Sequence, residues 1–316
     1  MVVTPISSSM KNNIRISLAL GSLLLLTSAC APYGKSAYST VDQSSTANGD
    51  LGAGAGDATG SGPTAPPTAQ DGTANGTANG TSKSVPPFNS LPEGPAKFSH
   101  PWSNTQTSIV IDAYSGNSID WKKMSSDPRM AGVIHRSSIG LQGDSQYASR
   151  RKLAKSYGLL WGAYHLGRSG DPVAQAKFFL KVIGDDPEAM MFLDLEDTSS
   201  SSMMNIPNAV KFMQYVVQAT GRIPVVYAND SVTKALNAAL GSDPIFTKSR
   251  LWYARFVQTI QSFPKGIWQT YFLWQFSSEI NCSRTGACLY NVAGTSSDMD
   301  INVFYGSKEA LASQWK

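Results

Sequence analysis

From residue 108 to the C-terminus, eight short runs of β-strand composition alternate with segments that carry a helical apolar pattern. This alternation favours βα units and a largely parallel sheet. The helical pattern fades after the fifth run, and Gly-, Pro- and Ser-containing loops join the last three. We therefore predict an α/β barrel of eight strands, with helices around only part of it. The predicted strands are 109–112, 132–136, 159–165, 190–196, 223–227, 251–255, 271–275 and 299–304, and the predicted helices are 146–157, 173–183, 206–219 and 231–240.

Each predicted strand is apolar along its length and carries a polar side chain that we place at its end. In an α/β barrel the C-terminal ends of the strands meet at one mouth, where active sites lie. One polar residue at a strand end means little, but eight in succession favour a functional mouth. The eight are Asp112, Arg136, His165, Glu196, Tyr227, Arg255, Gln275 and Asp300.

The sharpest local feature is Asp194-Leu195-Glu196, which follows a fully apolar stretch. Side chains alternate along a strand, so Asp194 and Glu196 share one face. Two carboxyl groups that close cannot both ionise easily, so one pKa should rise and that group should keep its proton. Glycoside hydrolysis needs this division of one acid and one ionised partner. Two alternatives remain, a solvated loop with helix-capping acids and a divalent-metal site that also uses Asp112 and Asp300.

Seven short motifs occur in order between residues 109 and 305 and resemble family 25 of the glycoside hydrolases, lysozymes of the muramidase type. The resemblance implies a TIM-like (β/α)5(β)3 barrel. It also implies hydrolysis of the β-1,4 bond between N-acetylmuramic acid and N-acetylglucosamine in peptidoglycan. The motifs are Ile111-Asp112 with Ile119-Asp120-Trp121, Gly162-Ala163-Tyr164-His165 with Gln175-Ala176, Leu193-Asp194-Leu195-Glu196, Thr220-Gly221-Arg222-Ile223-Pro224 with Val226-Tyr227, Leu251-Trp252-Tyr253-Ala254, Trp274-Gln275 and Asp300-Ile301-Asn302.

The same resemblance implies roles for individual residues. Glu196 is the general acid, Asp194 supports the acetamido group of the substrate, and Asp112 and Asp300 complete an acidic floor. It implies no cofactor and no metal, and it leaves open whether the intermediate is an acetamido-derived ring or a glycosyl-enzyme ester. Each aromatic candidate for sugar contact is about as well explained by core packing, and His165 is about as well explained by burial. Arg136 is more basic than the family pattern and is a candidate contact for a carboxylate of the peptide stem, but an ion pair at the rim explains it equally well. The predicted substrate-binding residues are Tyr164, His165, Arg136, Tyr227, Trp252, Trp274 and Gln275.

The N-terminal third resembles an export signal followed by a linker. Lys11 and Arg15 precede an apolar run too short to span a bilayer comfortably, and Thr27-Ser28-Ala29-Cys30 resembles a lipoprotein signal box. We predict a signal peptide over residues 1–30 with lipidated Cys30, and a disordered tether rich in Gly, Ala, Ser, Thr and Pro over residues 31–106. The predicted catalytic domain then spans residues 107–316. Ala31 rather than Asp follows the cysteine, and the resemblance to lipoprotein sorting signals then implies the outer membrane, if the cell has one.

Charge and cysteine content limit the remaining functions. The formal net charge of +4 is too small to indicate a nucleic-acid partner, but it suits an anionic wall or membrane surface. Cys282 and Cys288 lie close together, and in an exported protein we expect them to form a disulfide rather than two thiols. The expected protein is a monomeric, lipid-anchored muramidase of the cell envelope. The alternatives are an inactive peptidoglycan-binding envelope lipoprotein and a hydrolase of chitin-like polymers.

Overall fold

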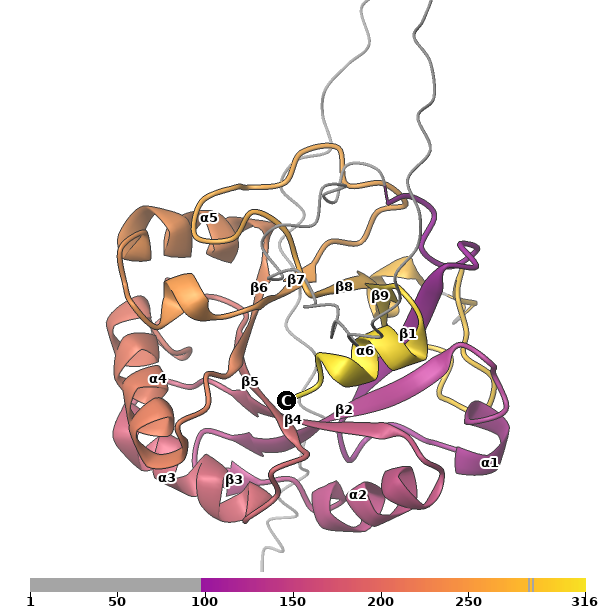
Figure 1. Cartoon of the computed structure of the whole chain (residues 1–316), viewed down its shortest axis with the longest axis horizontal. Coiled ribbons are helices and arrows are strands. Elements are labelled where there is room, and N and C mark those ends of the chain that lie inside the picture. Colours follow the sequence, from indigo (N-terminus) through magenta and orange to yellow (C-terminus); the bar gives the residue numbers. More distant parts are fainter. Residues whose placement is uncertain (1–97, 284, 286) are drawn as a thin grey trace, which may run out of the picture. The chain divides into compact units, whose positions relative to one another are not determined.

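The computed structural model describes residues 98–316, apart from residues 284 and 286. The predicted signal peptide, Cys30 and most of the predicted tether lie outside the described residues. The described part is a mixed α/β barrel (Figure 1). Its strands are β1 Thr107–Ala113, β2 Met130–Ile139, β4 Leu160–Leu166, β5 Met190–Leu195, β6 Val225–Asn229, β7 Leu251–Ala254, β8 Leu273–Ser277 and β9 Asp300–Tyr305, and a short β3, Gln142–Gly143, pairs with the end of β2.

The sheet closes because β1 pairs with β2 on one side and with β9 on the other. Strands β1, β2, β4, β5, β6, β7 and β8 run parallel, whereas β9 is antiparallel to both of its neighbours. Asp300 therefore begins β9 rather than ending it, which corrects the prediction that it lies at a strand's C-terminal end. The reversed direction still brings it opposite Asp112, at the C-terminal mouth of the barrel.

The four predicted helices are present, with ends within two residues of the expected positions. Asp171 caps α3 by accepting hydrogen bonds from the amides of Val173 and Ala174. Gly221 ends α4 in the left-handed conformation, with φ of 68°, as glycine does at little cost. The helices are α1 Trp121–Met124, α2 Tyr147–Ser156, α3 Pro172–Ile183, α4 Ile206–Thr220, α5 Asp230–Leu240 and α6 Lys308–Ser313.

Alternation along the strands divides the core into two layers. One set of side chains fills the barrel, including Val110, Phe192 and Trp252. The neighbouring strand side chains point outward and pack under the helices, as Leu193 does in the cluster that also contains Phe212 of α4. Each strand thus carries an inner and an outer face, and only inner-face residues near the strand ends can reach the mouth.

The C-terminal segment closes the end of the barrel opposite the mouth. In Figure 1 the yellow helix α6 lies across this end, and the chain terminates near the barrel axis. Trp315 is 3% exposed and packs against the rings of Phe192 and Phe272 inside the barrel. Its indole nitrogen donates a hydrogen bond of 2.8 Å to the carbonyl of Trp161. Access to the interior is therefore from the mouth.

Residues 98–106 pack against the barrel, so the prediction of a disordered tether extending to residue 106 was wrong for this stretch. Phe98 is buried against Trp274 and Tyr305, and Trp102 packs against Phe276. Burial of Phe98 and partial burial of Trp102 offset the entropy of ordering the segment.

In the loop between β8 and β9, Cys282 and Cys288 form a disulfide. Within residues 98–316, no helix has the length and hydropathy of a membrane span.

Candidate active site

Four carboxyl groups gather at the C-terminal mouth of the barrel. Asp112 lies directly opposite Asp300 in the β1–β9 ladder, and Asp194 lies at the end of β5 with Glu196 just beyond it. Asp194 interacts electrostatically with the other three. We call these four groups the acidic mouth. The structure thus brings together all four residues that the sequence predicted as catalytic.

The acidity of Asp194 is strongly perturbed by its surroundings. It is buried, and its Oδ1 atom has no hydrogen-bond partner within the part of the chain that the structure describes. Burial raises the pKa of Asp194 well above its usual value, and the negative charges of Glu196, Asp112 and Asp300 raise it further. The sequence predicted that one of the two pKa values in the pair 194/196 is raised, and the pKa of Asp194 is raised.

Asp112 is held by a chain of buried hydrogen bonds. Its Oδ2 accepts from Gln275 Nε2 at 2.9 Å and from Asn302 Nδ2 at 2.8 Å. Both amides are oriented in turn, since Gln275 Oε1 accepts from the Tyr227 hydroxyl at 2.8 Å and Asn302 Oδ1 accepts from Trp252 Nε1 at 2.6 Å. Two donors to one oxygen favour the ionised carboxylate. The network fixes Asp112 in a single orientation.

Asn302 was quoted in a motif but not predicted as a site residue. It is fully buried on the inner face of β9, two positions after Asp300. Strand alternation alone places residues 300 and 302 on one face. This spacing could have predicted from the sequence that Asn302 lies on the same face as Asp300.

Tyr164 and Arg136 form the wall of the mouth on neighbouring strands. They pair in the β2–β4 register, and Tyr164 is only partly buried. Desolvation raises the pKa of the Tyr164 hydroxyl, which also senses the charges of Arg136, Asp112 and Asp194. Tyr164 therefore stays a neutral phenol beside the acids, able to donate or accept a hydrogen bond.

Two predicted substrate-binding residues, His165 and Trp274, point away from the mouth. His165 is fully buried on the outer face of β4, where it hydrogen-bonds Ser138 and Gln175. Burial lowers its pKa to about 4, so it is a neutral packing residue. Trp274 also points outward, and its indole nitrogen donates to the carbonyl of Arg255.

Trp252 does face the barrel interior, but it is only 2% exposed. It lies beneath Tyr227 and Tyr164, with its ring contacting both. It supports the floor of the site and offers no open face to a sugar. Tyr227 and Gln275 are also buried, and they orient Asp112 as described above.

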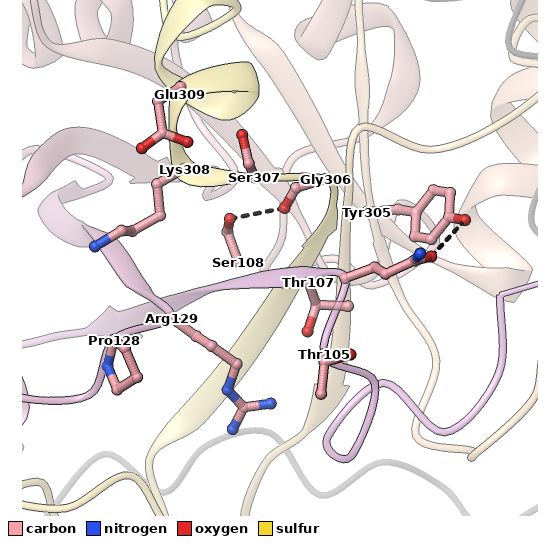
Figure 2. Close-up of a pocket in the computed structure, with 11 residues that line it drawn as sticks. Thr105, Thr107, Ser108, Pro128, Arg129, Tyr305, Gly306, Ser307, Lys308 and Glu309 are labelled. Carbon is pink, nitrogen blue, oxygen red and sulfur yellow. Dashed lines mark hydrogen bonds between the residues drawn. The ribbon is translucent and has the colours of Figure 1, made fainter.

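A pocket of about 520 Å³ opens at the other end of the barrel, where β1 begins and β9 ends (Figure 2). Figure 2 shows Arg129, Lys308 and Glu309 around it, with Ser108 hydrogen-bonded to Gly306. It contains none of the acidic-mouth residues. In the described residues, no group of three or more His, Cys, Asp or Glu side chains is arranged to hold a metal ion.

The sequence model of the glycosyl hydrolases family 25 matches residues 111–284, more than half of the chain. The chain belongs to this family. The matched region contains Asp112, Asp194 and Glu196, whereas Asp300 and Asn302 lie beyond it and are placed by the β9 pairings.

Solved structures of family 25 and related lysozymes share the fold. A bacterial lysozyme from Streptomyces coelicolor is 23% identical with a TM-score of 0.53, covering 67% of this chain and 98% of its own. A muramidase from Trichobolus zukalii and a family GH25 lysozyme from Aspergillus fumigatus are each 22% identical with TM-scores of 0.52, covering 66% of this chain and 99% of their own. No curated protein matches the sequence.

Proposed function

We propose that this glycoside hydrolase is a lysozyme that cleaves the β-1,4 bond between N-acetylmuramic acid and N-acetylglucosamine in peptidoglycan. The observation that carries the proposal is the acidic mouth, in which a buried carboxyl of raised pKa lies among three others. Glycoside hydrolysis needs carboxyl groups whose environments differ in this way. Family membership supports the reaction class, and the lysozyme and muramidase described above share the fold.

Glu196 has the position expected of the general acid. It follows β5 directly, interacts electrostatically with Asp194 and is partly exposed, so that a glycosidic oxygen can approach it. In the proposed reaction the proton shared by the Asp194–Glu196 pair passes from Glu196 to the leaving oxygen. The bond from that oxygen to the anomeric carbon breaks, and the anomeric carbon bonds instead to the acetamido oxygen or to a carboxylate oxygen. Water later supplies the hydroxyl of the new reducing end and returns the proton.

Asp194 has the position expected of the group that supports the substrate acetamido. A buried polar atom without a partner costs about 1–3 kcal/mol, so a ligand that supplies a partner gains affinity. The Oδ1 atom of Asp194 is such an atom. An acetamido N–H that donates to Oδ1 would fix the orientation of the carbonyl oxygen next to the anomeric carbon.

Digestion of purified peptidoglycan tests this function. The products are reduced with borohydride and analysed by mass spectrometry. A muramidase yields muramitol at the new ends, whereas glucosaminitol ends would show cleavage of the other glycosidic bond and overturn the assignment. Binding to peptidoglycan without products would favour the inactive envelope lipoprotein, and cleavage of chitin oligomers alone would favour a chitin-like substrate.

We further propose that the protein is anchored in the cell envelope through lipid on Cys30, with the outer membrane as its site if the cell has one. The support is the sequence pattern around Cys30. Several acyl chains, at about 0.8 kcal/mol per buried CH₂, would hold it stably. Fractionation of cells that express wild type and Cys30→Ser tests this, since the variant should leave the membrane fraction. Equal membrane retention would contradict it.

A further inference from the structure

Arg136 introduces a positive charge beside a site that is otherwise rich in carboxyl groups. It lies at the C-terminal end of β2, on the inner face and next to Tyr164 in the β2–β4 register. Its charge acts on both Tyr164 and Asp194, so the guanidinium lies within electrostatic range of the acidic mouth. A substrate that carries its own carboxylates would be repelled by the acidic mouth unless a cation were placed to receive them.

The Arg136 guanidinium is held from two sides. Asp144 Oδ2 contacts Nε at 3.2 Å and Nη2 at 3.1 Å, and the guanidinium carbon lies 4.6 Å from the ring centre of Tyr114. Asp144 is itself fixed, because its side chain is fully buried and accepts hydrogen bonds from the amides of Ser115 and Gln146. Desolvation raises the pKa of Asp144, but the hydrogen bonds from these two amides oppose it, and the pKa lies below its usual value. The arginine is therefore preorganised and loses little side-chain freedom on binding.

The Nη1 side of the Arg136 guanidinium is available to a ligand. The contacts with Asp144 use Nε and Nη2, and Nη1 of Arg136 makes no hydrogen bond to any residue in the described part of the chain. The side chain is 20% exposed. A guanidinium edge with two N–H groups matches the geometry of a carboxylate, and such charge-assisted bonds are stronger than neutral ones.

We propose that Arg136 is a specificity-determining residue that binds a carboxylate on the lactyl arm of the muramic acid residue. This inference rests on the proposed muramidase function. The carboxylate has two possible sources, the lactyl group itself in glycan without stem peptides, and the stem peptide in glycan that carries it. Chitin-like polymers have neither, so Arg136 favours peptidoglycan over them.

The test compares wild type, Arg136→Met and Arg129→Met on four glycans. These are peptidoglycan with stem peptides, the same material with its carboxyls amidated, glycan freed of stems by an amidase, and that glycan after amidation. Arg129 is a matched control because it also pairs with an aspartate and lies over an aromatic ring, but at the other end of β2. Should Arg136→Met fail to fold, Arg136→Gln keeps a donor for Asp144 without the charge.

The expected result is a KM about tenfold higher for Arg136→Met on a carboxylate-bearing glycan, which corresponds to about 1.4 kcal/mol. On the matching amidated glycan its KM should equal that of wild type, and kcat should change less than twofold. If the KM difference appears only with the stem-bearing glycan and its amidated form, the carboxylate belongs to the stem peptide. If it appears only with the stem-free glycan and its amidated form, the carboxylate is that of the lactyl group. Equal KM values on all four glycans, or an equal loss on the amidated ones, would overturn the inference. If wild type cleaves none of the four, the proposed function falls and this inference with it.

Discussion

Replacement of Asn302 by Leu should damage stability and activity together, because Asn302 links the core to the acidic mouth. The substitution keeps the side chain's approximate size but deletes three contacts. These are the 2.8 Å bond to Asp112, the 2.6 Å bond from the indole of Trp252 and the 3.0 Å bond to the carbonyl of Val110.

The magnitude follows from these contacts. Loss of the charge-assisted bond to Asp112 costs about 1.5–3 kcal/mol, and the buried Trp252 N–H left without a partner costs about 1–3 kcal/mol more. A total of roughly 2.5–6 kcal/mol lowers the melting temperature by roughly 5–24 °C in a domain of this size. Because Asp112 loses one of its two oriented donors, kcat/KM should fall roughly ten- to a hundredfold.

Calorimetry and muropeptide release would measure the two effects. Ile301→Val is the matched control, since Ile301 is equally buried on the same strand but faces the outer layer. It should cost only about 0.5–1.5 kcal/mol and leave kcat/KM unchanged. If Asn302→Leu melts within about 2 °C of wild type and keeps its activity, the proposed support of Asp112 is wrong.

Three further outcomes are expected. For Asp194→Asn, activity should fall, but the melting temperature should exceed that of wild type by a difference that grows as the pH rises above 3.8. The reason is that Asp194 has a higher pKa in the folded protein than in the unfolded chain, so wild type loses stability as the pH rises through this range and the Asn variant does not. A difference that stays constant with pH would contradict the raised pKa. His165 has a pKa of about 4 in the folded protein and 6.5 in the unfolded chain. Because the unfolded chain binds the proton first, wild type should lose stability as the pH falls from 6.5 to 4, and His165→Gln should lose less stability over the same range. Trp315→Ala, at the closed end, should cost about 3–5 kcal/mol in denaturant unfolding with kcat nearly unchanged.

The fold was largely predictable because its strands and helices carry strong periodic patterns. Helices α3 and α4 have apolar faces with a capping Asp171 and a terminating Gly221, and both were predicted to within one residue. The direction of β9 was not predictable in this way. Side chains alternate identically in parallel and antiparallel strands, so Asp300 could be assigned to a strand but not to its correct end.

The site was predicted where local sequence determines position and missed where tertiary packing does. Asp194 and Glu196 follow from alternation in one strand. Strand alternation also predicts that His165 and Trp274 lie on the outer face, because their neighbours Tyr164 and Gln275 lie on the inner one. The sequence could therefore have excluded both residues from the substrate-binding set. The burial of Trp252 depends on rings from several strands, which no single segment of sequence specifies.

The most direct test of the central claim is muropeptide release from purified peptidoglycan by wild type and by Glu196→Gln at matched concentration. The substitution keeps size and hydrogen bonding but removes the transferable proton. General acid catalysis contributes about 10²–10⁴-fold, so release should fall by at least a hundredfold with the melting temperature nearly unchanged. Release at the wild-type rate would contradict the assignment of Glu196 and of the acidic mouth as the catalytic centre.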